Sequence, residues 1–363
     1  MIDALFNQPN YLAAKKTLDV VALRQEAIAS NIANLETPGY QRMDIAPTFQ
    51  AELDRACSSR NAGQIATLKP NVITLDVEMP GMSGIEFLEE IMGSSPLPVV
   101  MLSSLTQSGT EISLKAYELG AVECFPKPLR ATPEQFAKTV GKLGKIVLAA
   151  ANSNLRERPR ERPVAAAATA HFEWNGHIAA FSASMGGIDA LSVLLAHYPA
   201  NCPPTVVLLQ TEPALADAFI ARLDADLKCS VRAAVDGAKL TQGVIHVAAD
   251  PSRHVVFESG DPGKLRMMER EPIEGARPSA NLLFGTIARA GVPAVGAVLT
   301  GMGEDGAKGL KLLRDSGGKT FAQDRSTATV SEAPAAAMAS GAAEQELGLE
   351  DLAEAVLHCC GQS

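Results

Sequence analysis

Residues 178–197 read IAAFSASMGGIDALSVLLAH, and this stretch decides the fold. Ile178 to Phe181 is a short apolar run typical of a buried strand. The small residues from Ser182 to Gly187 predict a tight turn, and Ile188 to His197 has the apolar spacing of a helix. A buried strand that turns directly into a helix is the building unit of parallel sheets covered by helices.

The same pattern recurs further along the chain. Thr205 to Gln210 and Pro293 to Leu299 are apolar strands followed by polar turns, and Arg277 to Ala290 predicts another helix. We therefore expect residues 174–363 to form an α/β domain with a doubly wound parallel sheet. Binding and catalytic residues in such sheets lie at the carboxyl ends of the strands.

Two polar residues at predicted strand ends could carry chemistry. Ser184 follows the first strand, where backbone N–H groups at the start of the next helix could stabilise an oxyanion. Asp305 lies in the turn LTGMGEDGA after the strand that ends at Leu299. Each residue could instead be a helix cap, and for Ser184 spacing alone favours the cap. A serine hydrolase would also need a histidine to move the proton between them.

An earlier segment, residues 66–130, predicts a second, smaller sheet. Asp76, Ser103 and Lys127 each end a short apolar strand, so they should converge on one sheet edge. A lone Asp in this position is ordinarily a turn or cap residue. A carboxylate, a hydroxyl and an ammonium group together suit phosphoryl transfer onto the carboxylate.

The motifs LKPNVITLDVEMPGMSGIEFL, VVMLSS and FPKP resemble the receiver domains of two-component response regulators. The resemblance implies that Asp76 is the phospho-acceptor, Ser103 the switch hydroxyl and Lys127 the conserved lysine. A receiver begins with a strand that carries an acidic pair for Mg²⁺, and no such strand precedes Asp76. We expect a truncated receiver that lacks two of five strands, impaired binding of Mg²⁺, and weak or absent phosphorylation.

Residues 174–363 resemble the catalytic domain of the chemotaxis protein-glutamate methylesterase through FSASMGGIDAL, VVLLQ, ARPSANLLF and VLTGMGEDGAKGL. The resemblance implies a nucleophile at Ser184, an orienting carboxylate at Asp305, and an oxyanion region around Met185 and Met302. The family's histidine position is occupied by Thr211, which has no group that accepts a proton near neutral pH. His246 and His254 are interpreted as structural or surface histidines.

Residues 1–55 predict an amphipathic helix, and NIANLETPGY resembles the start of flagellar basal-body rod proteins. Residues 131–173 predict a helix followed by a linker, whose segment LRERPRERPVAAAATA lacks apolar periodicity. The expected fold class is therefore α/β, with two doubly wound parallel-sheet domains, the first truncated, preceded by an amphipathic helix. The domain order suggests a fusion of a rod-protein start to a methylesterase.

Composition narrows the function classes. The 363 residues carry 32 basic and 41 acidic side chains, a formal net charge of −9, which argues against nucleic-acid binding. No apolar run is long enough to span a membrane and the N-terminus does not resemble a secretory signal, so we expect a cytoplasmic protein. The six histidines and six cysteines lack metal-binding spacing, and no cofactor is expected.

Two functions from different classes follow from these observations. The first is a methylesterase-like chemotaxis regulator that hydrolyses glutamyl methyl esters on chemoreceptor helices, or deamidates glutamines, with activity limited by Thr211. Its implied partners are the receptors and the chemotaxis histidine kinase. The alternative is a non-catalytic chemotaxis or flagellar binding protein that arose from a gene fusion, with the basal body as a further candidate partner.

Overall fold

The computed structural model describes residues 70–78, 83–103, 107–127, 132–154 and 172–362. The amphipathic helix expected within residues 1–55, and its rod-like motif, lie outside the described residues. The chain divides into two compact units, Met1–Thr67 and Leu68–Ser363, and all described elements belong to the second. Among these elements no helix is long and apolar enough to cross a membrane.

The first sheet contains three parallel strands in the order β1-β2-β3. The strands and their helices alternate along the chain: β1 (Ile73–Asp76), α5 (Gly84–Ser94), β2 (Val99–Ser103), α6 (Gln107–Glu118), β3 (Glu123–Pro126) and α7 (Pro133–Ala151). Helix α5 begins at a capping box, in which Ser83 and Glu86 each bond the other's backbone N–H. The parallel alternation confirms the α/β reading of this segment.

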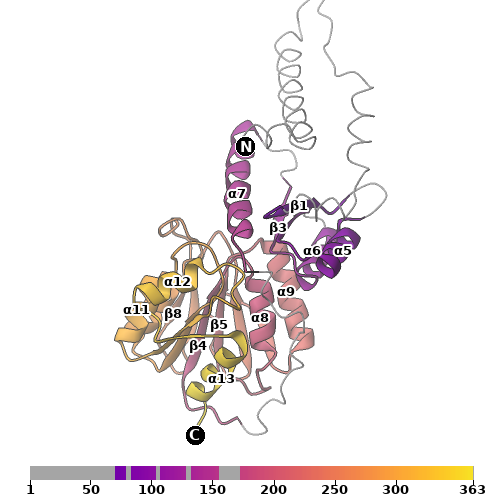
Figure 1. The fold of residues 1–363 in the computed structure, drawn as a ribbon. Coiled ribbons are helices and arrows are strands. Elements are labelled where there is room, and N and C mark those ends of the chain that lie inside the picture. The colour runs from indigo at the N-terminus through magenta and orange to yellow at the C-terminus, as the bar shows by residue number, and fades with distance from the viewer. Residues whose placement is uncertain (1–69, 79–82, 104–106, 128–131, 155–171, 363) are drawn as a thin grey trace, which may run out of the picture. The chain divides into compact units, whose positions relative to one another are not determined.

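The second sheet contains seven strands in the order β12-β11-β10-β4-β5-β7-β6, and every neighbouring pair is parallel. Figure 1 shows α11 and α12 on one side of this sheet and α8 and α9 on the other. The elements up to the middle of the domain are β4 (Ile178–Ala183), α8 (Gly187–Leu195), β5 (Thr205–Leu209), α9 (Pro213–Asp226), β6 (Ser230–Ala233) and β7 (Val244–Ala248).

The rest of the domain adds an antiparallel ribbon and completes the sheet. The ribbon pairs β8 (His254–Glu258) with β9 (Lys264–Met268). It is followed by α10 (Ala280–Ala290), β10 (Ala294–Val298), α11 (Ala307–Asp315), β11 (Lys319–Gln323), α12 (Glu332–Ala339), β12 (Gln345–Leu347) and α13 (Leu349–Cys360). The chain runs from β4 to one side through β5 and returns to the other side as β10. The crevice between β4 and β10 is therefore the switch point at which such sheets bind ligands.

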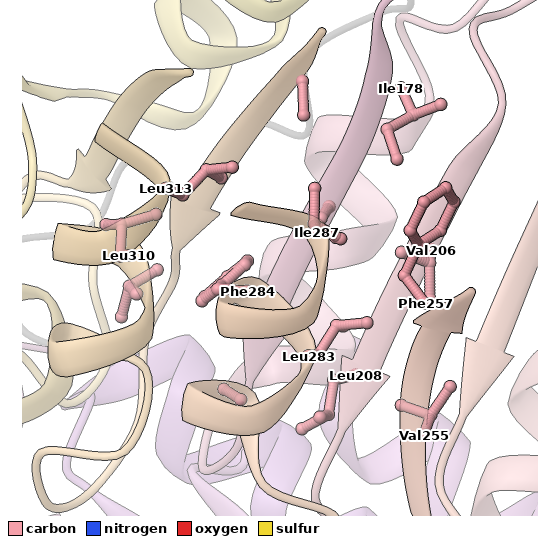
Figure 2. Packing of buried hydrophobic residues seen from close by; sticks show 14 of the residues in the cluster. Ile178, Val206, Leu208, Val255, Phe257, Leu283, Phe284, Ile287, Leu310 and Leu313 are labelled. Carbon is pink, nitrogen blue, oxygen red and sulfur yellow. The ribbon is translucent and has the colours of Figure 1, made fainter. Parts of the chain in front are cut away.

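The main apolar core lies between the sheet and α10. Leu283, Phe284 and Ile287 are fully buried on this helix. Figure 2 shows them pointing between the sheet strands and helix α11, whose Leu310 and Leu313 belong to the same cluster. Burying each such side chain contributes roughly 1.5–3 kcal/mol. This core fixes the N-terminus of α10 and the turn before α11, which both contribute to the site.

Candidate functional site at the switch point

Ser184 stands at the carboxyl end of β4, in the crevice with β10. Its N–H donates to the carbonyl oxygen of Thr300 (3.1 Å), and its Oγ accepts a hydrogen bond from the N–H of Met302 (3.1 Å). A Cβ on Gly301 would lie 2.3 Å from Ser184 Oγ, so only glycine allows this approach. The loops that follow β4 and β10 thus place the backbone N–H of Met302 within hydrogen-bond distance of Ser184 Oγ.

The turn after Ser184 leads directly into helix α8. Gly186 has φ of +76°, and the N–H of Gly187 donates to the carbonyl oxygen of Ser184 (2.8 Å). Ser184 is therefore two residues away from the N-cap position, which Gly186 occupies. Met185, the other predicted member of the oxyanion region, is buried beside Ser184 in the turn. Ser184 is therefore not the N-cap of helix α8.

Asp305 serves as a cap for a helix that is distant in sequence. Its Oδ1 accepts hydrogen bonds from the hydroxyl of Ser279 (2.9 Å) and the N–H of Asn281 (3.1 Å). Its Oδ2 accepts from the N–H of Ala280 (2.7 Å). The carboxylate thus lies at the N-terminus of α10, where the helix dipole stabilises a negative charge. Asp305 therefore caps α10 and not the helix that follows it, α11, whose N-cap is Gly306, and this contact does not exclude a role in orienting a side chain.

A fourth hydrogen bond to Asp305 comes from Gln210. Its Nε2 donates to Asp305 Oδ2 (3.3 Å) and to the carbonyl oxygen of Pro278 (3.0 Å). Gln210, Ser184 and Asp305 line one small cleft, together with Ser182, Ala183, Leu208, Leu299, Thr300, Met302 and Ala333. No histidine is among these lining residues, and Thr211 follows Gln210 without joining them.

Neither of the two discussed histidines supplies a base to this cleft. His254 is fully buried, and its Nδ1 accepts the N–H of Ser279 (3.2 Å) while its Nε2 bonds the carbonyl oxygen of Glu271 (3.0 Å). With both ring nitrogens committed to the backbone, His254 is a structural residue. His246 lies on β7, where its Nε2 bonds the carbonyl oxygen of Lys239 (3.2 Å) and burial lowers its pKa.

The three predicted receiver residues follow or end strands at one edge of the first sheet, where the side chains of Asp76 and Lys127 are in contact. Lys127 Nζ lies 2.6 Å from Asp76 Oδ1. Ser103 ends the neighbouring strand and is 3% exposed, and its Oγ accepts a hydrogen bond from Ser113 (3.3 Å). Of these motif residues, Asp76 alone supplies a carboxylate. Mg²⁺ requires near-octahedral oxygen ligation that such a set fits poorly, and we derive no step through this ion.

Clusters that could hold a metal ion are also absent elsewhere in the described part of the chain: no group of three or more His, Cys, Asp or Glu side chains converges there. The cysteines among these residues are free thiols, at positions 124, 202, 229, 359 and 360.

Several site residues were not found from the sequence. Gln210, Ser279 and Thr300 touch the predicted residues, yet none belongs to a catalytic residue type with diagnostic spacing. Their position was the available signal, because Gln210 directly follows β5 and Thr300 lies two residues after the end of β10. Ser279 immediately precedes α10 as its N-cap residue, but its side chain bonds Asp305 instead of its own helix.

A receiver-like sheet followed by a hydrolase-like sheet with a serine at its switch point defines a two-domain response regulator with an esterase-type effector. The family models agree with this class. The model for CheB methylesterase matches residues 179–356, that for the response regulator receiver domain matches residues 48–140, and that for flagella basal body rod protein matches residues 16–41. Along the chain the matched segments lie in the order rod protein, receiver and methylesterase, which is the order of the predicted fusion.

Curated relatives identify the family. The chain is 40% identical over 298 residues to protein-glutamate methylesterase/protein-glutamine glutaminase 1 of Caulobacter vibrioides, covering 81% of this chain and 86% of the relative. It is 40% identical over 299 residues to the enzyme of the same type in Agrobacterium fabrum, covering 81% and 84%. The chain belongs to the CheB protein-glutamate methylesterase family.

Among solved structures, the CheB methylesterase catalytic domain of Thermotoga maritima is 25% identical with a TM-score of 0.49, and the match covers 51% of this chain and 98% of that one.

Proposed function

We propose that this chain is a methylesterase-type chemotaxis regulator whose Ser184 site receives glutamyl methyl ester or glutamine side chains of chemoreceptors. The observation that carries the proposal is the hydrogen bond from Met302 N–H to Ser184 Oγ at 3.1 Å, at the switch point of the sheet. The names of the curated relatives support the reaction class.

In the proposed reaction, Ser184 Oγ attacks the ester carbonyl carbon and its hydroxyl proton passes to a water molecule. The carbonyl oxygen gains negative charge, and backbone N–H groups around Met185 and Met302 would stabilise it. The intermediate then collapses, its carbon–oxygen bond to the methoxy group breaks, and methanol leaves with a proton. Water hydrolyses the acyl-enzyme and regenerates Ser184.

Thr211 limits this reaction because it offers no acceptor for the proton of Ser184. Asp305 does not take over, since its oxygens accept four hydrogen bonds from Ser279, Ala280, Asn281 and Gln210. Loss of one triad member leaves only about 10³–10⁴-fold acceleration over water. The native chain is therefore a slow esterase, and the test is whether Thr211→His confers Ser184-dependent release of methanol from a methylated receptor.

The second candidate function is a receptor-binding protein without turnover. The contact between Gln210 and Asp305 favours it, because the amide already satisfies the carboxylate that would orient an imidazole. This function predicts co-sedimentation with receptor membranes that Ser184→Ala leaves unchanged. Absence of co-sedimentation by the native chain would contradict it.

Regulatory partners are inferred from the receiver motif and the rod-like segment. Asp76 would accept a phosphoryl group from the chemotaxis histidine kinase, and we propose that this transfer is weak because Asp76 is the one carboxylate among Asp76, Ser103 and Lys127. The rod-like residues 1–55 make the flagellar basal body a further candidate partner, testable by enrichment with purified basal bodies. Receptor cytoplasmic helices as substrate imply a cytoplasmic location.

A further inference from the structure

Thr300 makes hydrogen bonds through all of its polar groups, and two of these bonds hold the peptide groups on either side of the one that links Ser184 to Met185. Its carbonyl oxygen accepts the N–H of Ser184 (3.1 Å), and its Oγ1 donates to the carbonyl oxygen of Met185 (2.9 Å). The Ser184–Met185 segment is therefore held on both sides by one residue. Neither the sequence pattern nor the proposed reaction assigns a role to this threonine.

The hydroxyl of Thr300 also joins a third loop to the site. Its Oγ1 accepts the N–H of Val330 (2.9 Å) and lies 3.2 Å from the carbonyl oxygen of Val330. Because a hydroxyl has a single hydrogen, the shorter bond to Met185 takes it and the N–H of Val330 uses a lone pair. Val330 in turn accepts the N–H of Gly301, next to Met302. One hydroxyl thus connects the loops of Met185, Gly301 and Val330.

Thr300 itself is held rigidly. It is 0% exposed, and its N–H donates to Gln323 Oε1 (2.8 Å) on the neighbouring strand β11. Gln323 is also 0% exposed, and its Nε2 bonds the hydroxyl of Thr327 (3.4 Å). Buried polar groups in such a network lose much more when one bond is removed than exposed groups do.

We propose that Thr300 is a positioning residue for the Ser184 site. Its side-chain hydroxyl orients the peptide group between Met185 and Gly186. Without that hydroxyl, the carbonyl oxygen of Met185 loses its hydrogen-bond donor. The peptide group between Met185 and Gly186 then rotates so that the oxygen reaches another donor. The N–H of Met302, which bonds Ser184 Oγ and follows Gly301 in the same network, then leaves the direction in which an oxyanion would develop. A displacement of about 1 Å in such a site costs up to about 100-fold in rate.

The decisive variant is Thr300→Val, which keeps the shape of the side chain and removes the hydroxyl. Thr320→Val on β11 is the matched control, because Thr320 is also 0% exposed and its Oγ1 has no hydrogen-bond partner among the described residues. Thr300→Ser is the rescue variant, since it restores the hydroxyl. If Thr300→Val does not fold, Thr300→Cys offers a weaker donor of similar size.

The first measurement is amide hydrogen exchange of the otherwise native chain, which needs no catalysis. We expect Thr300→Val to raise exchange in the peptides that contain residues 184–187 and 328–331, and Thr320→Val and Thr300→Ser to leave both at the native level. Equal protection in Thr300→Val and Thr320→Val would overturn the proposal, whatever the activity of the chain.

The second measurement rests on the proposed function and uses methanol release in the Thr211→His background. We expect Thr300→Val to lower kcat about 10- to 100-fold with KM within twofold, and Thr300→Ser to recover kcat to within about threefold. A uniform effect on KM alone, or an equal loss in Thr320→Val, would overturn the positioning role. If Thr211→His is itself inactive, the proposed function fails, and hydrogen exchange alone decides the role of Thr300.

Discussion

Gln210 Nε2 donates to Asp305 Oδ2 at 3.3 Å, joining the loop that follows β5 to the turn that follows β10. The residue after Gln210 is Thr211, where the family resemblance implies the histidine of the triad. The carboxylate that would orient an imidazole is therefore engaged by the amide of the preceding residue. In the proposed function Ser184 is the nucleophile and backbone N–H groups are the oxyanion donors, while a proton acceptor between Ser184 and Asp305 is missing from the residues that line the cleft.

Asp305→Asn tests the capping role of this carboxylate. Asparagine has one acceptor oxygen, so at least one of the N–H groups of Ala280 and Asn281 would face an NH₂ group. We expect the free energy of unfolding to fall by about 1–3 kcal/mol, measured by urea denaturation. Asp315→Asn is the control, because Asp315 is exposed and pairs only with Lys311 on its own helix, and should cost less than about 0.5 kcal/mol. Equal small losses would show that Asp305 does not hold α10.

Gly301→Ala tests the close approach of the β10 loop to the nucleophile. The added methyl group would lie 2.3 Å from Ser184 Oγ, so the loop must move and the bond from Met302 must lengthen. We expect at least a tenfold loss of Ser184-dependent methanol release in the Thr211→His background. Gly285→Ala on α10 is the control, since its Cβ would lie 3.6 Å from Leu312, an ordinary contact. Unchanged turnover in Gly301→Ala would contradict the site geometry.

Much of the fold followed from local patterns, and much of the site did not. The strand, turn and helix at residues 178–197 were predicted because one short stretch contains all three signals, and the structure places them at β4 and α8. The meeting of Asp76 with Lys127 followed from strand ends in a parallel sheet. The bond between Gln210 and Asp305 joins residues 95 positions apart, and periodicity contains no information on such a contact. The β8–β9 ribbon was also missed, because short apolar runs do not distinguish ribbon strands from buried sheet strands.

Glu123 predicts a pH dependence of stability. Burial raises its pKa to about 7, against the opposing effect of hydrogen bonds from the Tyr117 hydroxyl and the Cys124 N–H. Between pH 4.5 and about 7 the folded protein keeps a proton that the unfolded chain has released, so the free energy of unfolding falls as the pH rises through this window.

Glu123→Gln removes this titration and keeps the acceptor oxygen. We expect the variant to match the native chain in stability near pH 4.5 and to exceed it by roughly 1–3 kcal/mol at pH 8. Urea denaturation across this range measures the difference, with the exposed Glu89→Gln as control. A stability difference that is constant with pH would contradict the assignment of the shift to Glu123.

Asp76 should be a poor phospho-acceptor even though Lys127 lies beside it. Among Asp76, Ser103 and Lys127, only Asp76 provides a carboxylate, and divalent-cation-assisted phosphoryl transfer depends on several oxygen ligands. Incubation with acetyl phosphate and Mg²⁺, followed by intact mass spectrometry, should show no phosphoryl adduct on either the native chain or Asp76→Asn. A stoichiometric phosphoryl adduct that Asp76→Asn abolishes would overturn the expectation.

We propose that the esterase site of this chain is complete except for its proton acceptor. The most direct measurement is the initial rate of methanol release from methylated receptor membranes by four proteins: native, Ser184→Ala, Thr211→His and the Thr211→His/Ser184→Ala double variant. We predict that the Thr211→His variant releases methanol about 10²–10⁴-fold faster than the native chain. The double variant should fall back to the rate of Ser184→Ala. A native chain that already turns over as fast as Thr211→His, or a Thr211→His rate equal to that of the double variant, would contradict it.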